Sequence, residues 1–143
     1  MFFGEFRHNI DTKGRLSIPA KMRSQCGENV YVTRGNDGCL SIYTEEGWQN
    51  YYEELLKLPQ KKKSTRVYMR LITSLTSLCE FDKLGRINIP LRLREEGKLE
   101  KECVVVGVGD HIEIWNQQLW DNFYDDNKDS FDDIYEDLEE IEM

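Results

Sequence analysis

The sequence predicts an α+β fold in which two related half-barrels complete each other. A five-residue motif occurs twice, as Asp11-Thr12-Lys13-Gly14-Arg15 and Asp82-Lys83-Leu84-Gly85-Arg86. Apolar and polar residues alternate on both sides of each copy, which is typical of half-buried strands. Each half offers roughly 45 patterned residues, a size at which a lone hydrophobic core is marginal. We therefore expect the two halves to bury their apolar faces against each other.

The repeated motif is the centre of a longer internal duplication. Residues 8–23 align with residues 79–94 without a gap, and the similarity resumes where residues 40–44 match residues 112–116. A repeat of this kind has to be recognised first, because missing it misreads the whole fold. Two copies are too few for a solenoid, so a pair of mutually completing units is expected. The aligned pairs that keep the same residue are Asp11 and Asp82, Gly14 and Gly85, Arg15 and Arg86, Ile18 and Ile89, Pro19 and Pro90, and Arg23 and Arg94.

The first unit begins with a predicted strand over residues 5–10, where apolar side chains alternate with polar ones. A turn follows, because Asp11 can accept hydrogen bonds from the backbone ahead of it and Gly14 can take a positive φ. A second strand covers residues 16–18. Pro19 ends it by removing a backbone donor, and its fixed φ suits the start of a short helix over residues 20–25.

A strand pair and a longer helix complete the first unit. Residues 30–33 and 39–43 are the predicted strands, joined by the Gly-Asn-Asp-Gly turn at residues 35–38. Thr44 is placed to cap the helix that follows, and Asn116 stands at the equivalent position of the second unit. Pro59 blocks any continuation. The apolar positions that recur at helical spacing are Trp48, Tyr51, Tyr52, Leu55 and Leu56.

A connector and the second unit follow. Residues 60–63 are basic and expected to be exposed, and a connecting helix is predicted from the apolar positions 67, 68, 71, 72 and 75. The scheme then repeats, with a helix over residues 91–96, a buried strand over 103–106 and a last strand over 112–115. The predicted organisation is a first unit at 1–58, the connecting helix at 59–75, a second unit at 76–124 and an acidic tail at 125–143.

Charge is distributed unevenly along the chain. The formal net charge is −8, which by itself argues against a nucleic-acid partner. From Asp121 onward, however, there are 11 acidic residues and one lysine, a net charge of −10, so the first 120 residues carry a net charge of +2. The charge of the first 120 residues must therefore be considered region by region, and not from the net charge of the whole chain. Apolar residues in the tail are spaced for an amphipathic helix, although its composition also fits a disordered segment.

Several classes of protein are disfavoured. The four cysteines lie far apart without a Cys-x-x-Cys pair, so we expect reduced, partly buried thiols and no metal site. No cofactor-binding loop is visible, since the glycines of residues 107–109 lack a Lys-Ser/Thr pair. No apolar run approaches the length of a membrane span, and no signal sequence is evident, so a soluble cytosolic protein is expected.

A strand, a Gly-Arg turn, a second strand, a proline, a short helix and a hairpin, present twice in one chain, resemble the MraZ family. The resemblance covers residues 1–123 and implies two AbrB-like (SpoVT-AbrB) swapped-hairpin units, of the double-split β-barrel type, forming one pseudo-symmetric barrel. The matching features are both Asp-x-x-Gly-Arg turns, both Ile-Pro steps, Arg66 and Arg70 in the connector, and the Glu113-Ile114-Trp115 end.

The resemblance also implies a function. Members of the family are bacterial transcriptional regulators that bind direct repeats of double-stranded DNA near their own promoter, upstream of the operon for cell division and wall synthesis. The resemblance further implies a ring-shaped homo-oligomer, located in the cytoplasm at the nucleoid. Leu84 stands where the first copy has Lys13. This difference leaves open whether the two turns contribute equally to DNA binding.

The candidate DNA contacts are the basic residues in and around the two turns. Each turn arginine follows a glycine, where its guanidinium can reach a phosphate or the O6 and N7 atoms of guanine. The alternative is that each turn only closes a hairpin, with the arginine covering apolar surface or pairing with the nearby aspartate. Asp11, Gly14, Asp82 and Gly85 are expected to shape the turns. The predicted DNA contacts are Lys13, Arg15, Lys21, Arg23, Lys83, Arg86, Arg92 and Arg94.

Two other functions remain to be compared with DNA binding. In the first, the chain is an assembly module whose turns grip an acidic partner, such as the tail of a neighbouring chain. In the second, it is an enzyme, which is disfavoured because no nucleophile with a placed base, metal cluster or cofactor loop is visible. The acidic tail raises a further hypothesis, that it competes with DNA for the basic turns.

Overall fold

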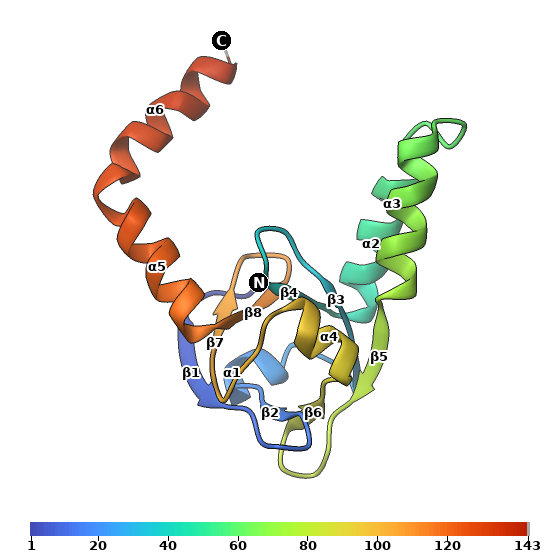
Figure 1. Cartoon of the computed structure of the whole chain (residues 1–143), viewed down its shortest axis with the longest axis vertical. Coiled ribbons are helices and arrows are strands. Elements are labelled where there is room, and N and C mark those ends of the chain that lie inside the picture. The colour runs from blue at the N-terminus through green and yellow to red at the C-terminus, as the bar shows by residue number, and fades with distance from the viewer. Residues whose placement is uncertain (143) are drawn as a thin grey trace.

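The computed structural model describes residues 1–142, with side chains through residue 139 (Figure 1). The first unit contains β1 (Glu5–Asn9), β2 (Arg15–Ser17), α1 (Ala20–Arg23), β3 (Asn29–Arg34), β4 (Leu40–Tyr43) and α2 (Glu45–Leu56), followed by α3 (Lys63–Ser74). The second contains β5 (Ser77–Glu80), β6 (Arg86–Asn88), α4 (Leu91–Glu96), β7 (Glu102–Gly107), β8 (Ile112–Asn116) and α5 (Gln117–Asn127), followed by a short 3-10 turn (Lys128–Ser130) and α6 (Phe131–Glu142). No helix within residues 1–142 is both long and apolar enough to cross a membrane.

The two units exchange their first strands within one antiparallel sheet. The strand order is β1-β7-β8-β4-β3-β5. β1 pairs with β7 of the second unit, and β5 pairs with β3 of the first. At the centre β4 pairs with β8, where Ser41 lies opposite Glu113. Read from either edge, the order passes through equivalent strands of the two units. The predicted mutual burial of the halves is therefore confirmed, and it is achieved by exchange of strands.

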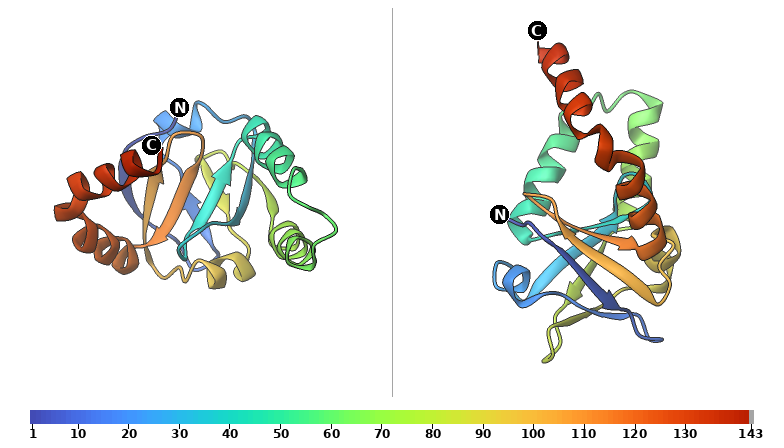
Figure 2. Two further views of the ribbon diagram at one scale, coloured as in Figure 1. Left: turned by 90° about the horizontal axis from the view of Figure 1, so that it is seen from above. Right: turned by 90° about the vertical axis from the view of Figure 1, so that its left-hand side faces the viewer.

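The remaining strands form a separate two-stranded ribbon. β2 and β6 pair antiparallel, with Leu16 opposite Ile87 at the middle of the ribbon. Among the described strands, pairing in the large sheet ends at β1 on one side and β5 on the other. The sheet is thus open, and the predicted closed barrel is not confirmed. The two views of Figure 2 show the curved sheet between two pairs of helices, with the ribbon at the end away from the chain termini.

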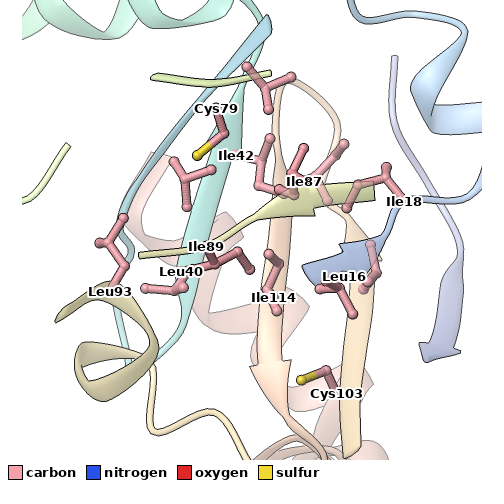
Figure 3. Close-up of a cluster of buried hydrophobic side chains, with 14 of the residues drawn as sticks. Leu16, Ile18, Leu40, Ile42, Cys79, Ile87, Ile89, Leu93, Cys103 and Ile114 are labelled. Carbon is pink, nitrogen blue, oxygen red and sulfur yellow. The ribbon is translucent and has the colours of Figure 1, made fainter. Parts of the chain in front are cut away.

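The core lies between the ribbon and the sheet. Leu16 and Ile87 from the ribbon meet Ile42 and Ile114 from the central strands, and none of these four side chains is more than 1% exposed (Figure 3). Because successive side chains of a strand point to opposite faces, burying Leu16 and Ile87 directs their neighbours outward. The core therefore fixes which residues of the ribbon face solvent.

Aromatic residues hold the longer helices against the outer strands. Trp48 of α2 stacks on Tyr31 of β3, with ring centroids 5.4 Å apart. In the second unit Trp115 of β8 contacts Trp120 and Phe123 of α5, at centroid distances of 5.4 and 5.5 Å. Such pairs contribute beyond the apolar area that they bury. The tryptophans of α2 and α5 therefore hold these helices against the sheet.

Local signals in the sequence placed most helix ends correctly. Thr44 Oγ1 accepts a hydrogen bond from the Gly47 amide at 3.0 Å, and Asn116 Oδ1 accepts one from the Leu119 amide at 3.1 Å, so both predicted caps are confirmed. The connecting helix was predicted from residue 59 but begins at Lys63, because residues after Pro59 form a turn in which the Lys62 amide donates to the Pro59 carbonyl. The tail, which the sequence left open, is helical over most of its described length, with α6 at Phe131–Glu142.

The four cysteines are free thiols, as predicted, and Cys39, Cys79 and Cys103 are buried. Desolvation raises the pKa of the Cys26 and Cys103 thiols to about 11, so both are protonated at neutral pH. Side chains of this kind pack as small apolar groups.

His111 lies in a hydrogen-bonded cluster beside the centre of the sheet. Its Nδ1 is 2.6 Å from Asp110 Oδ1, and its Nε2 is 3.3 Å from Glu113 Oε2. The ring also stacks on Tyr43 at a centroid distance of 5.3 Å. The hydrogen bond to Glu113 raises the pKa of His111, and the bond to Asp110 adds to the effect. The folded state therefore favours the protonated imidazole.

We expect the stability contributed by His111 to be lost as the pH rises above about 6.5 and through its raised folded-state pKa. Because the folded-state pKa of His111 is above the unfolded value of about 6.5, its contribution is complete below that value and is lost as the pH rises through the folded pKa. Thermal unfolding should show a smaller pH-dependent fall in His111→Gln than in the wild type. His8→Gln, at an exposed position, is the matched control and should keep the wild-type dependence. If the melting temperatures of the wild type and of His111→Gln fell equally with rising pH, the expectation would be contradicted.

Candidate nucleic-acid interface

The first turn (residues 11–15) is closed by one carboxylate. Asp11 Oδ1 accepts hydrogen bonds from the backbone amides of Lys13 and Arg15, at 3.0 and 2.9 Å. Its Oδ2 accepts from Arg15 Nε at 2.6 Å. Gly14 adopts a φ of 88°, and its amide donates to the Asp11 carbonyl at 3.0 Å. Aspartate and glycine thus play the turn-forming roles predicted for them.

The second turn (residues 82–86) repeats this geometry. Asp82 Oδ1 accepts from the amides of Leu84 and Arg86, both at 2.9 Å, and its Oδ2 accepts from Arg86 Nε at 2.8 Å. Gly85 has a φ of 76°. In both turns, hydrogen bonding to the arginine backbone amide is the main reason that the pKa of the aspartate is lowered. Both carboxylates are therefore ionised at neutral pH and held by structural bonds, which disfavours an acid-base role.

The ion pair predicted by the alternative reading is present, but it uses only one side of each guanidinium. Arg15 and Arg86 bond to their aspartates through Nε. Within the described residues, no hydrogen bond from the Nη1 or Nη2 atoms of either arginine is found. Because arginine carries five N–H donors in a rigid fork, four of them remain for a ligand. The aspartate thus orients the guanidinium and leaves its bidentate edge free.

The ribbon places the two arginines on one face. Arg15 lies opposite Asn88, and Arg86 lies opposite Ser17, so the arginines are diagonal neighbours across the antiparallel pair. Diagonal positions of this kind lie roughly 7–8 Å apart. The intervening Leu16 and Ile87 point into the core, which directs both arginines away from it. Two turns that are 71 positions apart in the sequence therefore share one surface.

Arg23 and Arg94 connect each unit to the turn of the other. Arg23 Nη1 donates to the Ile18 carbonyl at 2.8 Å, and its guanidinium lies over Gly85. Arg94 Nε donates to the Ile89 carbonyl at 2.9 Å and lies over Gly14. The Ile89 amide in turn donates to the Gly14 carbonyl at 2.8 Å. Both arginines thus support the turns, and a direct contact with DNA stays a prediction for them.

The other predicted basic residues lie at the surface around the turns. Lys13 and Lys83 are exposed on the turns themselves, and Lys21 and Arg92 are exposed on α1 and α4. The structure therefore groups Lys13 and Arg15 with Arg94, and Lys83 and Arg86 with Arg23. Sequence reasoning listed all of these residues but did not predict that Arg23 and Arg94 would each lie over the glycine of the other unit. The contact over each glycine arises from the strand exchange, which the alignment of the repeats does not encode.

The fold and these paired turns define a class: a duplicated, strand-exchanged α+β protein that displays two equivalent Asp-x-x-Gly-Arg turns on one ribbon. The family model described as "MraZ protein, putative antitoxin-like" matches the chain twice, at residues 1–71 and 72–140. The chain therefore belongs to the MraZ family. The match in two parts agrees with the internal duplication.

Close relatives extend along the whole chain. The chain is 49% identical over all 143 residues to the transcriptional regulator MraZ of Ligilactobacillus salivarius, with complete coverage of both proteins. It is 48% identical over the same length to the protein of that name from Lactobacillus gasseri. With the one from Pediococcus pentosaceus it shares 47% over 138 residues, 96% of each chain. These relatives are named as regulators and not as enzymes, in agreement with the sequence expectation.

Proposed function

We propose that this chain is a DNA-binding transcriptional regulator that contacts double-stranded DNA through its two Gly-Arg turns. The observation that carries the proposal is the free bidentate edge of Arg15 and of Arg86 on one ribbon face. Such an edge matches both phosphate oxygens and guanine O6 and N7. The major groove, about 12 Å wide, admits a two-stranded ribbon. The names of the relatives support the same function.

The local charge favours DNA despite the negative net charge. Each turn carries one aspartate against a lysine and an arginine, and the arginine that lies over the glycine adds a further positive charge. The acidic helix α6 lies at the end of the molecule opposite the ribbon (Figure 1). Competition between α6 and DNA for the turns of the same chain is therefore disfavoured.

We further propose that several copies act together as a ring, on direct repeats upstream of the operon for cell division and wall synthesis, in the cytoplasm at the nucleoid. One or two phosphate contacts per chain are weak, because each contributes a salt-dependence slope of only about −0.9. Linking several chains raises the effective concentration of every later contact. Within each chain, we propose that the two units are AbrB-like swapped hairpins that complete each other.

Arg15→Ala and Arg86→Ala should each weaken binding to DNA upstream of the protein's own gene. A lost bidentate base contact costs about 1–3 kcal/mol, or roughly 5- to 150-fold in Kd, and a lost phosphate contact reduces the salt slope by about 1. Fluorescence anisotropy at two or more salt concentrations separates the two kinds of contact. The double variant is expected to lose specific binding.

Lys57→Ala is the matched control, because this exposed cation lies at the end of α2, outside the ribbon. It should bind as the wild type does. Light scattering on the arginine variants distinguishes the alternative assembly module, since a regulator keeps its oligomer when the turns are altered and an assembly module loses it. Wild-type affinity of the double variant for DNA would exclude the proposed interface.

A further inference from the structure

Two helices hold the same position in the order of elements of the two units and carry opposite charges. α3 follows α2 in the first unit, and α6 follows α5 in the second; both contain 12 residues. A segment repeats within them, because Arg66-Val67-Tyr68-Met69-Arg70-Leu71 aligns with Asp133-Ile134-Tyr135-Glu136-Asp137-Leu138. Val67, Tyr68 and Leu71 are matched by Ile134, Tyr135 and Leu138, whereas Met69 is replaced by Glu136. Both arginines are replaced by aspartates.

The kept positions form an exposed apolar stripe on each helix. Val67, Tyr68 and Leu71 are 42%, 40% and 51% exposed on α3. The equivalent residues of α6, Ile134, Tyr135 and Leu138, are 43%, 60% and 56% exposed. Spacings of three and four residues place each set on one side of its helix. Both stripes therefore offer contiguous apolar surface that the described chain does not cover.

The stripe of α3 borders a groove. A hollow of about 310 Å³ lies between α3 and the turn that joins β3 to β4. Tyr68 and Leu71 line it from the helix, together with Ile72 and Leu75, and residues 34–38 line it from the hairpin. Apolar side chains from another helix can enter a groove of this kind at a spacing of three or four residues. The groove thus gives the stripe of α3 the form of a helix-binding site.

The charges of α3 and α6 indicate which helix could occupy the groove. α3 contains Lys63, Arg66 and Arg70 without an acidic residue, whereas α6 contains seven acidic residues without a basic one. Within the described side chains, no ion pair involves Arg66, Arg70, Asp133 or Asp137. Figures 1 and 2 show the two helices projecting from opposite sides of the sheet. A basic stripe and an acidic stripe are therefore present on one molecule but are held apart.

We infer that α6 of one copy packs against α3 of a second copy, stripe against stripe. An antiparallel arrangement brings Asp133 and Asp137 next to Arg70 and Arg66. It also aligns the helix dipoles favourably. Because the two surfaces differ, the contact is head-to-tail and can repeat from copy to copy. This inference deepens the homo-oligomer of the proposed function by naming its interface.

A charge exchange tests the inference directly. Arg66→Asp/Arg70→Asp places aspartates beside both stripes, and Asp133→Arg/Asp137→Arg places arginines beside both. Each variant alone should lose self-association by more than about 10-fold in Kd, because juxtaposed like charges cost several kcal/mol. An equimolar mixture should recover assemblies of wild-type size, since every α6 then finds a complementary α3. Size-exclusion chromatography with light scattering measures all three samples.

Matched controls separate this result from general charge effects and from misfolding. Glu46→Arg/Glu53→Arg reverses two exposed acids of α2 and should assemble as the wild type does. Circular dichroism verifies the fold of every variant. Deleting residues 131–143 should abolish assembly without altering the core, because α6 extends away from the body (Figure 1). The inference is overturned if the wild type is a monomer, if a variant alone assembles normally, or if folded variants fail to reassemble on mixing.

Failure of this inference and failure of the proposed function give different results. Arg15 and Arg86 lie on the ribbon, outside α3 and α6. An assembly that forms normally but does not bind DNA contradicts the proposed function. It does not contradict the interface between α6 and α3. Binding of DNA by a chain whose assembly is insensitive to the charge exchange contradicts the interface alone.

Discussion

Leu16→Ala is expected to lower the free energy of unfolding by about 2–5 kcal/mol. Leu16 is completely buried at the middle of β2, directly opposite Ile87 of β6, which is buried to the same extent. Removing its side chain loses apolar burial and leaves a cavity between the ribbon and the sheet. The loss is a large share of the roughly 5–15 kcal/mol that stabilises a typical domain. Urea denaturation followed by tryptophan fluorescence measures it.

The control for Leu16→Ala is another leucine near the ribbon. Leu84 sits in the second turn and is 71% exposed, so Leu84→Ala should change stability by no more than about 0.5 kcal/mol. The double variant Leu16→Ala/Ile87→Ala should lose cooperative unfolding, because both sides of one contact are removed. DNA binding should fall with stability, since this contact holds the arginine-bearing ribbon on the sheet. Equal effects of the two single leucine changes would show that the ribbon is not anchored here.

Gly14→Ala is expected to cost about 2–5 kcal/mol and to disrupt the first turn. Two causes act together at this position. A φ of 88° is strained for any residue with a Cβ. The added Cβ would also lie 2.7 Å from the Ile89 carbonyl oxygen and 2.8 Å from Arg94 Nε, so the backbone of the other unit would have to move. Thermal denaturation and DNA binding should both report the change.

Other glycines separate the two causes. Gly38 has a φ of 90° with open space around it, so Gly38→Ala should show only the backbone strain, about 1–2 kcal/mol. Gly27 has neither a positive φ nor a neighbour within contact, and Gly27→Ala should stay within about 0.5 kcal/mol of the wild type. If Gly14→Ala cost no more than Gly38→Ala, the contact between the units at this turn would be energetically unimportant.

Local sequence signals predicted the elements because each one depends on residues that are close in the chain. The Asp11 turn, the Thr44 cap and the helix start after Pro90 all follow from hydrogen bonds or φ values within a few residues. The tail was left open for the same reason. Its apolar spacing fits a helix, but its charge also fits disorder, and no local signal decided between them.

The candidate site was predicted in its residues but not in its arrangement. Repetition singled out Arg15 and Arg86, and their aspartates were expected to be turn residues. Sequence reasoning did not foresee that each aspartate would bond only to the Nε atom of its arginine side chain. In the part of the chain that the structure describes, the rest of each guanidinium is left free. Nor did sequence reasoning place Arg94 over Gly14, because those two residues belong to different units.

The sequence by itself determined that the chain is a duplication, that each copy carries an Asp-x-x-Gly-Arg turn, and which side chains alternate toward a core. Those features depend on residue type and short spacing, which a linear pattern contains. Only the tertiary structure decided that β1 and β5 change places between the units and that β2 pairs with β6. The physical reason is that neither half can bury its apolar face alone, and the register in which the halves meet depends on packing between residues that are distant in the chain.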